Sequence, residues 1–260
     1  MADLVVTEDR GAVRHVVLNR PEKRNAFNGD LVLALGAALR AAAHDDAVHC
    51  VVLRGEGPMF SSGMDIGSLA GLAAEPSGLR RFRTELMDIW NLPESMPKPT
   101  VAVLHGACIG GALELALACD LRVAAAETVL GLPETRVGLI PDVGGSSRLP
   151  AVVGLGRAKE LIMTSKLIDG TEAERIGLVN RVAPAAELDA AVDALVGELL
   201  ACGPVAVALA KRVMDAAAKP ALAATLEFEV AAQQICVATE DFSEGTAALA
   251  EKRPPVFKGR

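Results

Sequence analysis

HGACIGGALELALACD, residues 105–120, places a single carboxylate inside an otherwise apolar helical pattern. Gly110 and Gly111 open the pattern, and the positions three and four away from Glu114 are all apolar or glycine. A helix that is apolar on every side is normally buried, and an unpaired buried charge costs several kcal/mol. Glu114 therefore needs a raised proton affinity or a specific partner. The alternative is a first-turn Glu that faces solvent and complements the helix dipole.

The residues before these glycines predict a strand that leads directly to them. Pro97 and Pro99 disfavour helix and lead extended chain into TVAVLHG, residues 100–106. Glycines at a helix start expose backbone N–H groups beside the positive end of the helix dipole, which suits a developing negative charge. Gly111 is the expected donor, because a side chain there would block the approach of a ligand oxygen.

Short apolar runs elsewhere predict further strands, and amphipathic runs predict helices between them. The predicted strands are 13–18, 49–54, 100–106, 120–125 and 128–131, and the predicted helices are 28–43 and 78–92. Asn28 is the expected N-cap of the first helix. After about residue 184 the pattern is helical. We expect an α/β core over residues 1–195 and a helical region over residues 196–260 that packs against another subunit.

The composition favours a globular chain and excludes several classes of protein. The chain has 260 residues, of which 51% are hydrophobic, so a large core is expected. A net charge of -7, 3% aromatic residues and no tyrosine oppose nucleic-acid binding and attraction to anionic lipid. Five cysteines without a CxxC pair argue against a metal site and fit a reducing compartment. With no apolar run of roughly 18 residues, we expect a cytoplasmic protein outside the membrane.

A second loop of small residues, MFSSGMDIGSL at 59–69, also follows a predicted strand. Its N–H groups would supply a second donor next to that of Gly111. An ordinary turn capped by Asp65 accounts for the same pattern equally well.

A third segment, GLPETRVGLIPDVGGSSRLP at 131–150, carries two acids in turns beside apolar sequence. Glu134 follows a strand and a proline, and the alternative to a functional role is a solvated residue or a partner of Arg136. Asp142 precedes two glycines, and the alternative there is an N-cap for a helix that begins near Val143.

These blocks together resemble the crotonase superfamily, also called the enoyl-CoA hydratase/isomerase family. The resemblance covers nearly the whole chain, and the order and spacing of the blocks agree. The matching blocks are NRPEKRNAFN (19–28), FSSGMDIGSL (60–69), KPTVAVLHGACIGGALELALACDLRVAA (98–125), ETRVGLIPDVGGSSRLP (134–150) and EKRPPVFK (251–258). The resemblance implies an α/β spiral of ββα repeats, helices that form trimers or hexamers, and an acyl-CoA substrate without a separate cofactor.

The resemblance also implies catalytic roles. The N–H groups of Met64 and Gly111 match the oxyanion hole, in which the thioester carbonyl of the acyl-CoA becomes an enolate. Glu114 and Glu134, 20 positions apart, match the two glutamates of enoyl-CoA hydratases. Glu134 would exchange a proton with the α-carbon, while Glu114 would orient the water and help to accept its proton. Two such carboxyls in an apolar pocket titrate as a coupled pair.

A binding site for the coenzyme A portion follows from the same resemblance. The matching residues are Lys23, Arg24, Ala26, Ser62, Asp65, Ile66 and Gly110, with Lys252 reaching in from a neighbouring subunit. The alternative for the basic residues is a solvated surface. Met64 stands where many relatives have alanine, so its side chain either reshapes the acyl tunnel or fills the core.

Asp142 departs from the simple hydratase pattern, in which glycine is typical at this place. Its offset of eight positions from Glu134 is that of the acidic pair in dienoyl-CoA isomerases, which usually have Asp where Glu114 stands. Hydration is the first hypothesis because both of its glutamates are present, and double-bond isomerisation is the alternative. A non-catalytic acyl-CoA binder and an RNA-binding relative are less favoured, given both glutamates and the negative charge.

Overall fold

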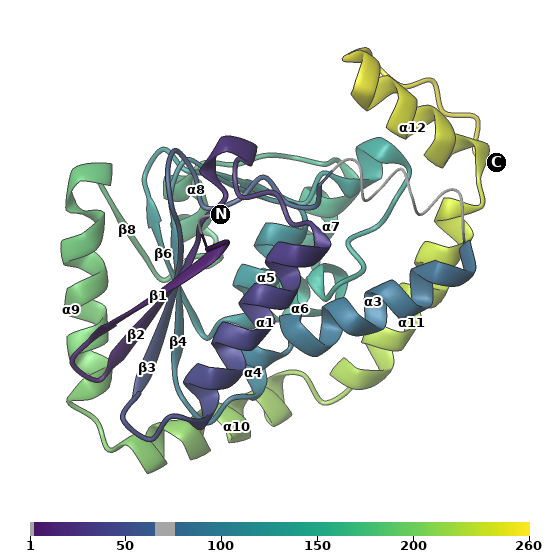
Figure 1. Cartoon of the computed structure of the whole chain (residues 1–260). Helices are drawn as coiled ribbons and strands as arrows, with labels where there is room; N and C mark the ends of the chain where they lie inside the picture. Colours follow the sequence, from purple (N-terminus) through teal and green to yellow (C-terminus); the bar gives the residue numbers. More distant parts are fainter. Residues whose placement is uncertain (1–2, 66–75) are drawn as a thin grey trace.

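The computed structural model describes residues 3–65 and 76–260 and is built around one six-stranded sheet (Figure 1). The strand order is β1-β2-β3-β4-β6-β8, in which β1 and β2 are antiparallel and the other neighbours are parallel. The strands are β1 Val5–Arg10, β2 Val13–Leu18, β3 Cys50–Gly55, β4 Thr100–Leu104, β6 Leu121–Ala125 and β8 Arg181–Ala183. A second, parallel pair joins β5 Ala107–Ile109 to β7 Val129–Gly131.

The central strands are buried because helices cover both faces of the sheet. Every residue of β4 is buried, as expected for a parallel strand written as a continuous apolar run. α9 Leu188–Leu200 lies on one side of the sheet, while α1 Gly29–His44 and α5 Gly111–Ala118 lie on the other (Figure 1). The core therefore divides into two apolar layers separated by the sheet.

The helices predicted at 28–43 and 78–92 are observed as α1 Gly29–His44 and α3 Pro76–Trp90. The remaining helices are α4 Leu92–Ser95, α6 Gly145–Val153, α7 Leu155–Met163, α8 Gly170–Arg175, α10 Pro204–Ala218, α11 Leu222–Val237, α12 Glu240–Glu251, and the 3-10 turns η1 Pro21–Lys23, η2 Glu134–Val137 and η3 Ala185–Glu187. Asn28 caps α1 as predicted, since its side chain accepts a 3.1 Å hydrogen bond from the Leu31 N–H.

Four helices follow the last strand, which confirms the predicted change to helical structure. α11 runs beside α3, and α12 packs on η2, where Phe242 is fully buried (Figure 1). The predicted boundary at residue 195 falls inside α9, so the division into two regions stays a prediction.

Across residues 3–65 and 76–260, no single helix is long and apolar enough to cross a membrane. One pair, Ala185–Leu200 with Pro204–Ala218, meets the length and composition criteria together but is bent by 101°. In the same part of the chain, no group of three or more His, Cys, Asp or Glu side chains has the arrangement of a metal site.

Candidate active site

A backbone hydrogen bond connects the start of α5 to the end of β7. Glu134 follows β7 in the chain, so this connection places it next to the glycines that begin α5. The Gly110 N–H donates to the Gly131 carbonyl oxygen at 2.9 Å. Gly110 itself has φ 60 and ψ -131, a conformation that glycine adopts readily. A Cβ placed on Gly110 would lie 2.7 Å from Glu134 Oε1, so the carboxyl lies directly over the N-terminus of the helix.

The loop that contains Met64 lies against the same helix start. Phe27 fixes its position, because the Phe27 N–H donates to Gly63 O and Phe27 O accepts from the Asp65 N–H, each at 2.9 Å. A Cβ placed on Gly111 would lie 3.4 Å from Met64 Cγ. Within residues 3–65 and 76–260, neither the Met64 N–H nor the Gly111 N–H has a protein acceptor. The two predicted donors are therefore neighbours.

Glu114 is buried, and the solvent-facing alternative is wrong. It is only 2% exposed, and its Oε1 accepts hydrogen bonds from the N–H groups of Val143 at 3.0 Å and Gly145 at 2.8 Å. Burial raises its pKa well above the ordinary value, and the nearby Glu134 raises it further. The apolar helix required either a raised proton affinity or a specific partner, and Glu114 has both.

Glu134 is neither a solvated turn residue nor a partner of Arg136. The residue as a whole is half-buried, yet its Oε2 is buried and has no hydrogen-bond partner among the described residues. Burial raises the pKa of Glu134 to about 8, and the charge of Asp142 acts in the same direction. An unpartnered carboxyl oxygen with this proton affinity is a candidate proton donor.

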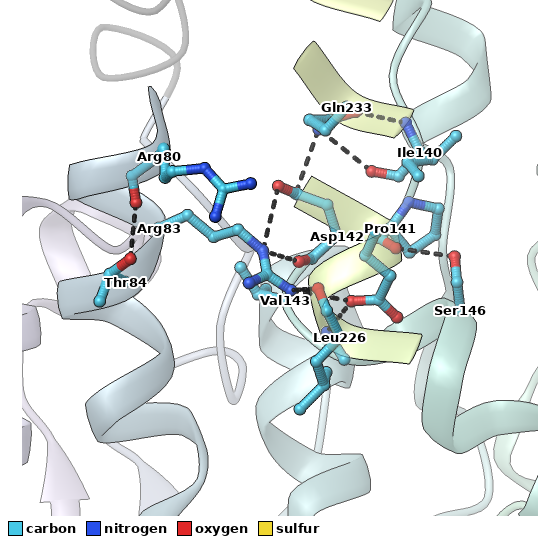
Figure 2. Close-up of polar contacts among 12 residues, drawn as sticks. Arg80, Arg83, Thr84, Ile140, Pro141, Asp142, Val143, Ser146, Leu226 and Gln233 are labelled. Carbon is cyan, nitrogen blue, oxygen red and sulfur yellow. Dashed lines mark hydrogen bonds and ion pairs between the residues drawn. The ribbon is translucent and has the colours of Figure 1, made fainter. Parts of the chain in front are cut away.

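Asp142 does not cap a helix, which corrects one sequence alternative. α6 begins at Gly145, its N-cap is Gly144, and no side chain caps it. Instead, Gln233 Nε2 donates to Asp142 Oδ1 at 3.1 Å, and Arg83 Nε lies 3.9 Å from Asp142 Oδ2 (Figure 2). Burial raises the pKa of Asp142 to about 7, while the charge of Arg83 opposes this shift. Asp142 is therefore held by α3 and α11, and its charge acts on both Glu114 and Glu134.

Sequence reasoning missed three buried polar residues of this site: Arg83, Glu229 and Gln233. Glu229 is 3% exposed and accepts hydrogen bonds from the Gly144 N–H at 2.9 Å and the Ser147 N–H at 2.7 Å. Glu229 lies in LEFEVAAQQICV, which also contains Glu227 and two glutamines, so the lone-acid signal that identified Glu114 is missing there.

The structure brings together most residues predicted to bind the coenzyme A portion. The Ser62 N–H donates to the Arg24 carbonyl oxygen at 3.0 Å, so the two loops that carry these residues are adjacent. The side chains of Lys23 and Arg24 are exposed there, and Ala26 is buried. Asp65 is paired with Arg20 at 3.0 Å.

Two other residues of the predicted coenzyme A site stay predictions. Ile66 lies outside the described residues. Lys252 is exposed at the C-terminal end of α12, and its approach to a neighbouring subunit stays a prediction.

We expect Gly110→Ala to lower the free energy of unfolding by about 1–3 kcal/mol, the usual cost of a side chain in a conformation reserved for glycine. The new Cβ would also displace the Glu134 carboxyl, which lies 2.7 Å from its position. Gly29→Ala in α1 is the control, because a Cβ there meets nothing within 4 Å. Urea unfolding measures both variants, and equal effects at Gly110 and Gly29 would contradict the described geometry.

Comparison with known proteins identifies the family of the chain. The family described as enoyl-CoA hydratase/isomerase matches residues 8–260. A crotonyl-CoA hydratase from Syntrophomonas wolfei subsp. wolfei is 36% identical over 254 residues, covering 97% of each chain. A mitochondrial methylglutaconyl-CoA hydratase from Mus musculus is 39% identical over 272 residues, covering 98% of this chain and 85% of that protein.

Solved structures show the same fold. An enoyl-CoA hydratase from Mycobacterium avium subsp. paratuberculosis K-10 superposes with a TM-score of 0.87 at 30% identity, covering 98% of each chain. The chain belongs to the enoyl-CoA hydratase/isomerase family. Both the α/β crotonase fold and the prediction of an enzyme of this family are confirmed, and the family implies an acyl-CoA substrate.

Proposed function

We propose that this protein catalyses the reversible syn addition of water to a trans-2-enoyl-CoA. The observation that carries the proposal is a helix start that brings together the buried Glu114, the Glu134 carboxyl over Gly110, and two N–H groups that lack acceptors among the described residues. Acids and hydrogen-bond donors in such an arrangement suit a reaction that moves protons while a carbonyl oxygen gains charge.

The oxyanion is the first element of the proposed mechanism. The thioester carbonyl oxygen accepts hydrogen bonds from the N–H groups of Met64 and Gly111. Water addition at the β-carbon turns this carbonyl into an enolate, so the two bonds strengthen as the transition state forms. Donors of this kind contribute about 3 kcal/mol each. The absence of a side chain at Gly111 lets the oxygen approach the helix start.

Proton transfer divides between the two glutamates. Two neighbouring carboxyls in an apolar site do not readily ionise together, so the pair retains a proton near neutral pH. The N–H groups of Val143 and Gly145 stabilise charge on Glu114 and oppose the rise in pKa that burial and Glu134 cause. We assign to Glu114 the role of accepting the proton of the attacking water. Glu134, whose pKa is raised to about 8, holds the proton that passes to the α-carbon. Both groups act from one side of the double bond, which gives syn addition.

The names of the relatives support hydration of short acyl chains. The relative from Syntrophomonas wolfei is a crotonyl-CoA hydratase, and the mouse relative is a methylglutaconyl-CoA hydratase.

Isomerisation of a dienoyl-CoA is the second candidate, and one observation favours it. Burial raises the pKa of Asp142 to about 7, and its charge acts on both glutamates, which would suit a second proton-transfer group.

Asp142→Asn distinguishes these two functions. We expect the variant to hydrate crotonyl-CoA with less than about a tenfold loss of kcat, below the ~10²–10⁴-fold contribution of a general acid or base. The reason is that Asp142 is bonded to Gln233 on α11, while Glu114 and Glu134 complete the hydratase site. Ultraviolet absorbance follows the loss of the conjugated thioester. If wild type instead converts only a 3,5-dienoyl-CoA, and Asp142→Asn abolishes that activity, the protein is an isomerase.

We further propose a homotrimer or a hexamer as the working assembly. Large apolar side chains are exposed along α10 and α11: Val205, Leu209, Val213, Met214, Phe228 and Ile235. An exposed apolar set of this size favours burial against another subunit. Light scattering coupled to size exclusion tests the assembly, and a monomeric mass would contradict it. A location in the cytoplasm stays a prediction from the sequence.

A further inference from the structure

Arg83 reaches from α3 to the 140–147 turn, which runs into the first residues of α6, and to α11 (Figure 2). Its Nε donates to the Asp142 carbonyl oxygen at 2.6 Å, and its Nη2 donates to the Leu226 carbonyl oxygen at 2.5 Å. The side chain is 5% exposed. A buried guanidinium that binds backbone on two separate segments fixes their relative position.

α11 holds the same turn at both ends. Glu229 Oε1 accepts from the Ser147 N–H at 2.7 Å, and its Oε2 accepts from Arg83 Nη2 at 3.3 Å. Gln233 exchanges two hydrogen bonds with the Ile140 backbone, at 3.0 and 3.2 Å. Between these two anchors lie the Val143 and Gly145 N–H groups that hold the Glu114 carboxyl. The position of the Glu114 carboxyl therefore depends on the hydrogen bonds by which α3 and α11 hold the turn.

We propose that Arg83 is a positioning residue. It holds the Asp142 carboxyl and the 140–147 turn in place against Glu114 and Glu134, and Glu229 and Gln233 hold the same turn from α11. This inference rests on the proposed hydration, which gives the two glutamates their roles. Arg83 acts through its neighbours and has no assigned contact with substrate.

Charged and titratable groups reach Asp142 from four elements. They are Arg83 on α3, Glu229 and Cys236 on α11, Glu134 on η2 and Glu114 on α5. Glu229 and burial raise the pKa of Asp142, and Arg83 lowers it. Removal of Arg83 therefore raises the pKa of Asp142 and leaves this carboxyl more often neutral at pH 7–8. A neutral Asp142 repels charge on Glu134 less, so the pKa of Glu134 falls.

The first test is a titration that does not depend on turnover. Carbon-13 NMR of the labelled Asp and Glu carboxyls follows Asp142 in wild type, Arg83→Met and Arg83→Lys, and Asp142→Asn assigns the signal. We expect the pKa of Asp142 to rise in Arg83→Met and to stay near the wild-type value in Arg83→Lys, which keeps the charge. An unshifted Asp142 in folded Arg83→Met would overturn the proposal.

The second test is the pH dependence of crotonyl-CoA hydration. In Arg83→Met we expect kcat to fall on the order of tenfold to a hundredfold with little change in KM, as for a displaced catalytic group. The alkaline limb of the kcat profile should move to lower pH, because it reports the loss of the Glu134 proton. Combining Arg83→Met with Asp142→Asn should move this limb no further than Asp142→Asn alone.

Arg80→Met is the matched control. Arg80 lies one turn earlier on α3 and forms an exposed ion pair with Glu227 at 3.0 Å, so its loss should leave kcat and the pH profile unchanged.

If Arg83→Met fails to fold, Arg83→Lys is the deciding variant. A kcat lowered about tenfold with an unshifted pH profile supports the proposal, because one ammonium cannot replace the forked guanidinium. Unchanged kcat in Arg83→Lys would overturn it. Wild type that never hydrates crotonyl-CoA would overturn the proposed function alone, because the titration still decides the role of Arg83.

Discussion

Glu134→Gln should lower kcat for crotonyl-CoA hydration by roughly 10²- to 10⁴-fold, the contribution expected of a general acid. Glutamine has nearly the same shape but carries no proton that it can give to the α-carbon. Its amide also fits the place of the carboxyl over Gly110, so the helix start should keep its structure. Steady-state kinetics at several pH values measure the effect, and circular dichroism confirms the fold.

The same substitution should stabilise the protein at alkaline pH. Burial raises the pKa of Glu134 from 4.5 to about 8, so between these values the native state binds more protons than the unfolded state. Stability contributed by this group therefore falls as pH rises through that window. Glutamine removes this loss, and we expect Glu134→Gln to unfold at higher urea concentration than wild type at pH 8.5 but not at pH 4.5. A variant less stable than wild type at both pH values would contradict the buried environment of Glu134.

Glu114→Gln is expected to reduce kcat by a similar factor of roughly 10²–10⁴, because the amide cannot accept the proton of the attacking water. Its Oε1 can still accept from the N–H groups of Val143 and Gly145, so the turn should remain in place. Crotonyl-CoA turnover and binding measured on the same preparation separate loss of chemistry from loss of affinity.

Glu114→Ala is the comparison that tests the turn itself. Alanine leaves the two buried N–H groups without their acceptor, which costs about 1–3 kcal/mol for each group. We therefore expect Glu114→Ala to be inactive and destabilised, and Glu114→Gln to be inactive with stability close to wild type. Near-normal turnover by Glu114→Gln would remove Glu114 from the proposed mechanism.

The sequence predicts those parts of the site that depend on local pattern. The proline-led strand, the glycine turn and the fully apolar helix α5 are consecutive, and together they require that Glu114 be buried. The central parallel strands were also predictable, because each is a short apolar run. β1 and β8 were not predicted, since most of β1 is exposed and β8 has only three residues.

The rest of the site depends on contacts between distant segments. Glu134 reaches Gly110 only because β5 pairs with β7, a partnership that neither short strand encodes locally. Asp142 resembles an N-cap in sequence, yet Gln233, which lies 91 positions later, binds its carboxyl instead. Family resemblance supplied the pairing of Glu114 with Glu134, and it offered nothing for Arg83.

The central claim is that water is added across the enoyl double bond, and isotope tracing tests it most directly. Purified protein is incubated with crotonyl-CoA in water enriched in oxygen-18 and, separately, in deuterium oxide, and the products are analysed by mass spectrometry. We expect 3-hydroxybutyryl-CoA that carries one solvent oxygen at C3 and one solvent deuterium at C2. Solvent deuterium in the acyl chain without solvent oxygen would show proton shuttling instead, and would contradict the proposed hydratase.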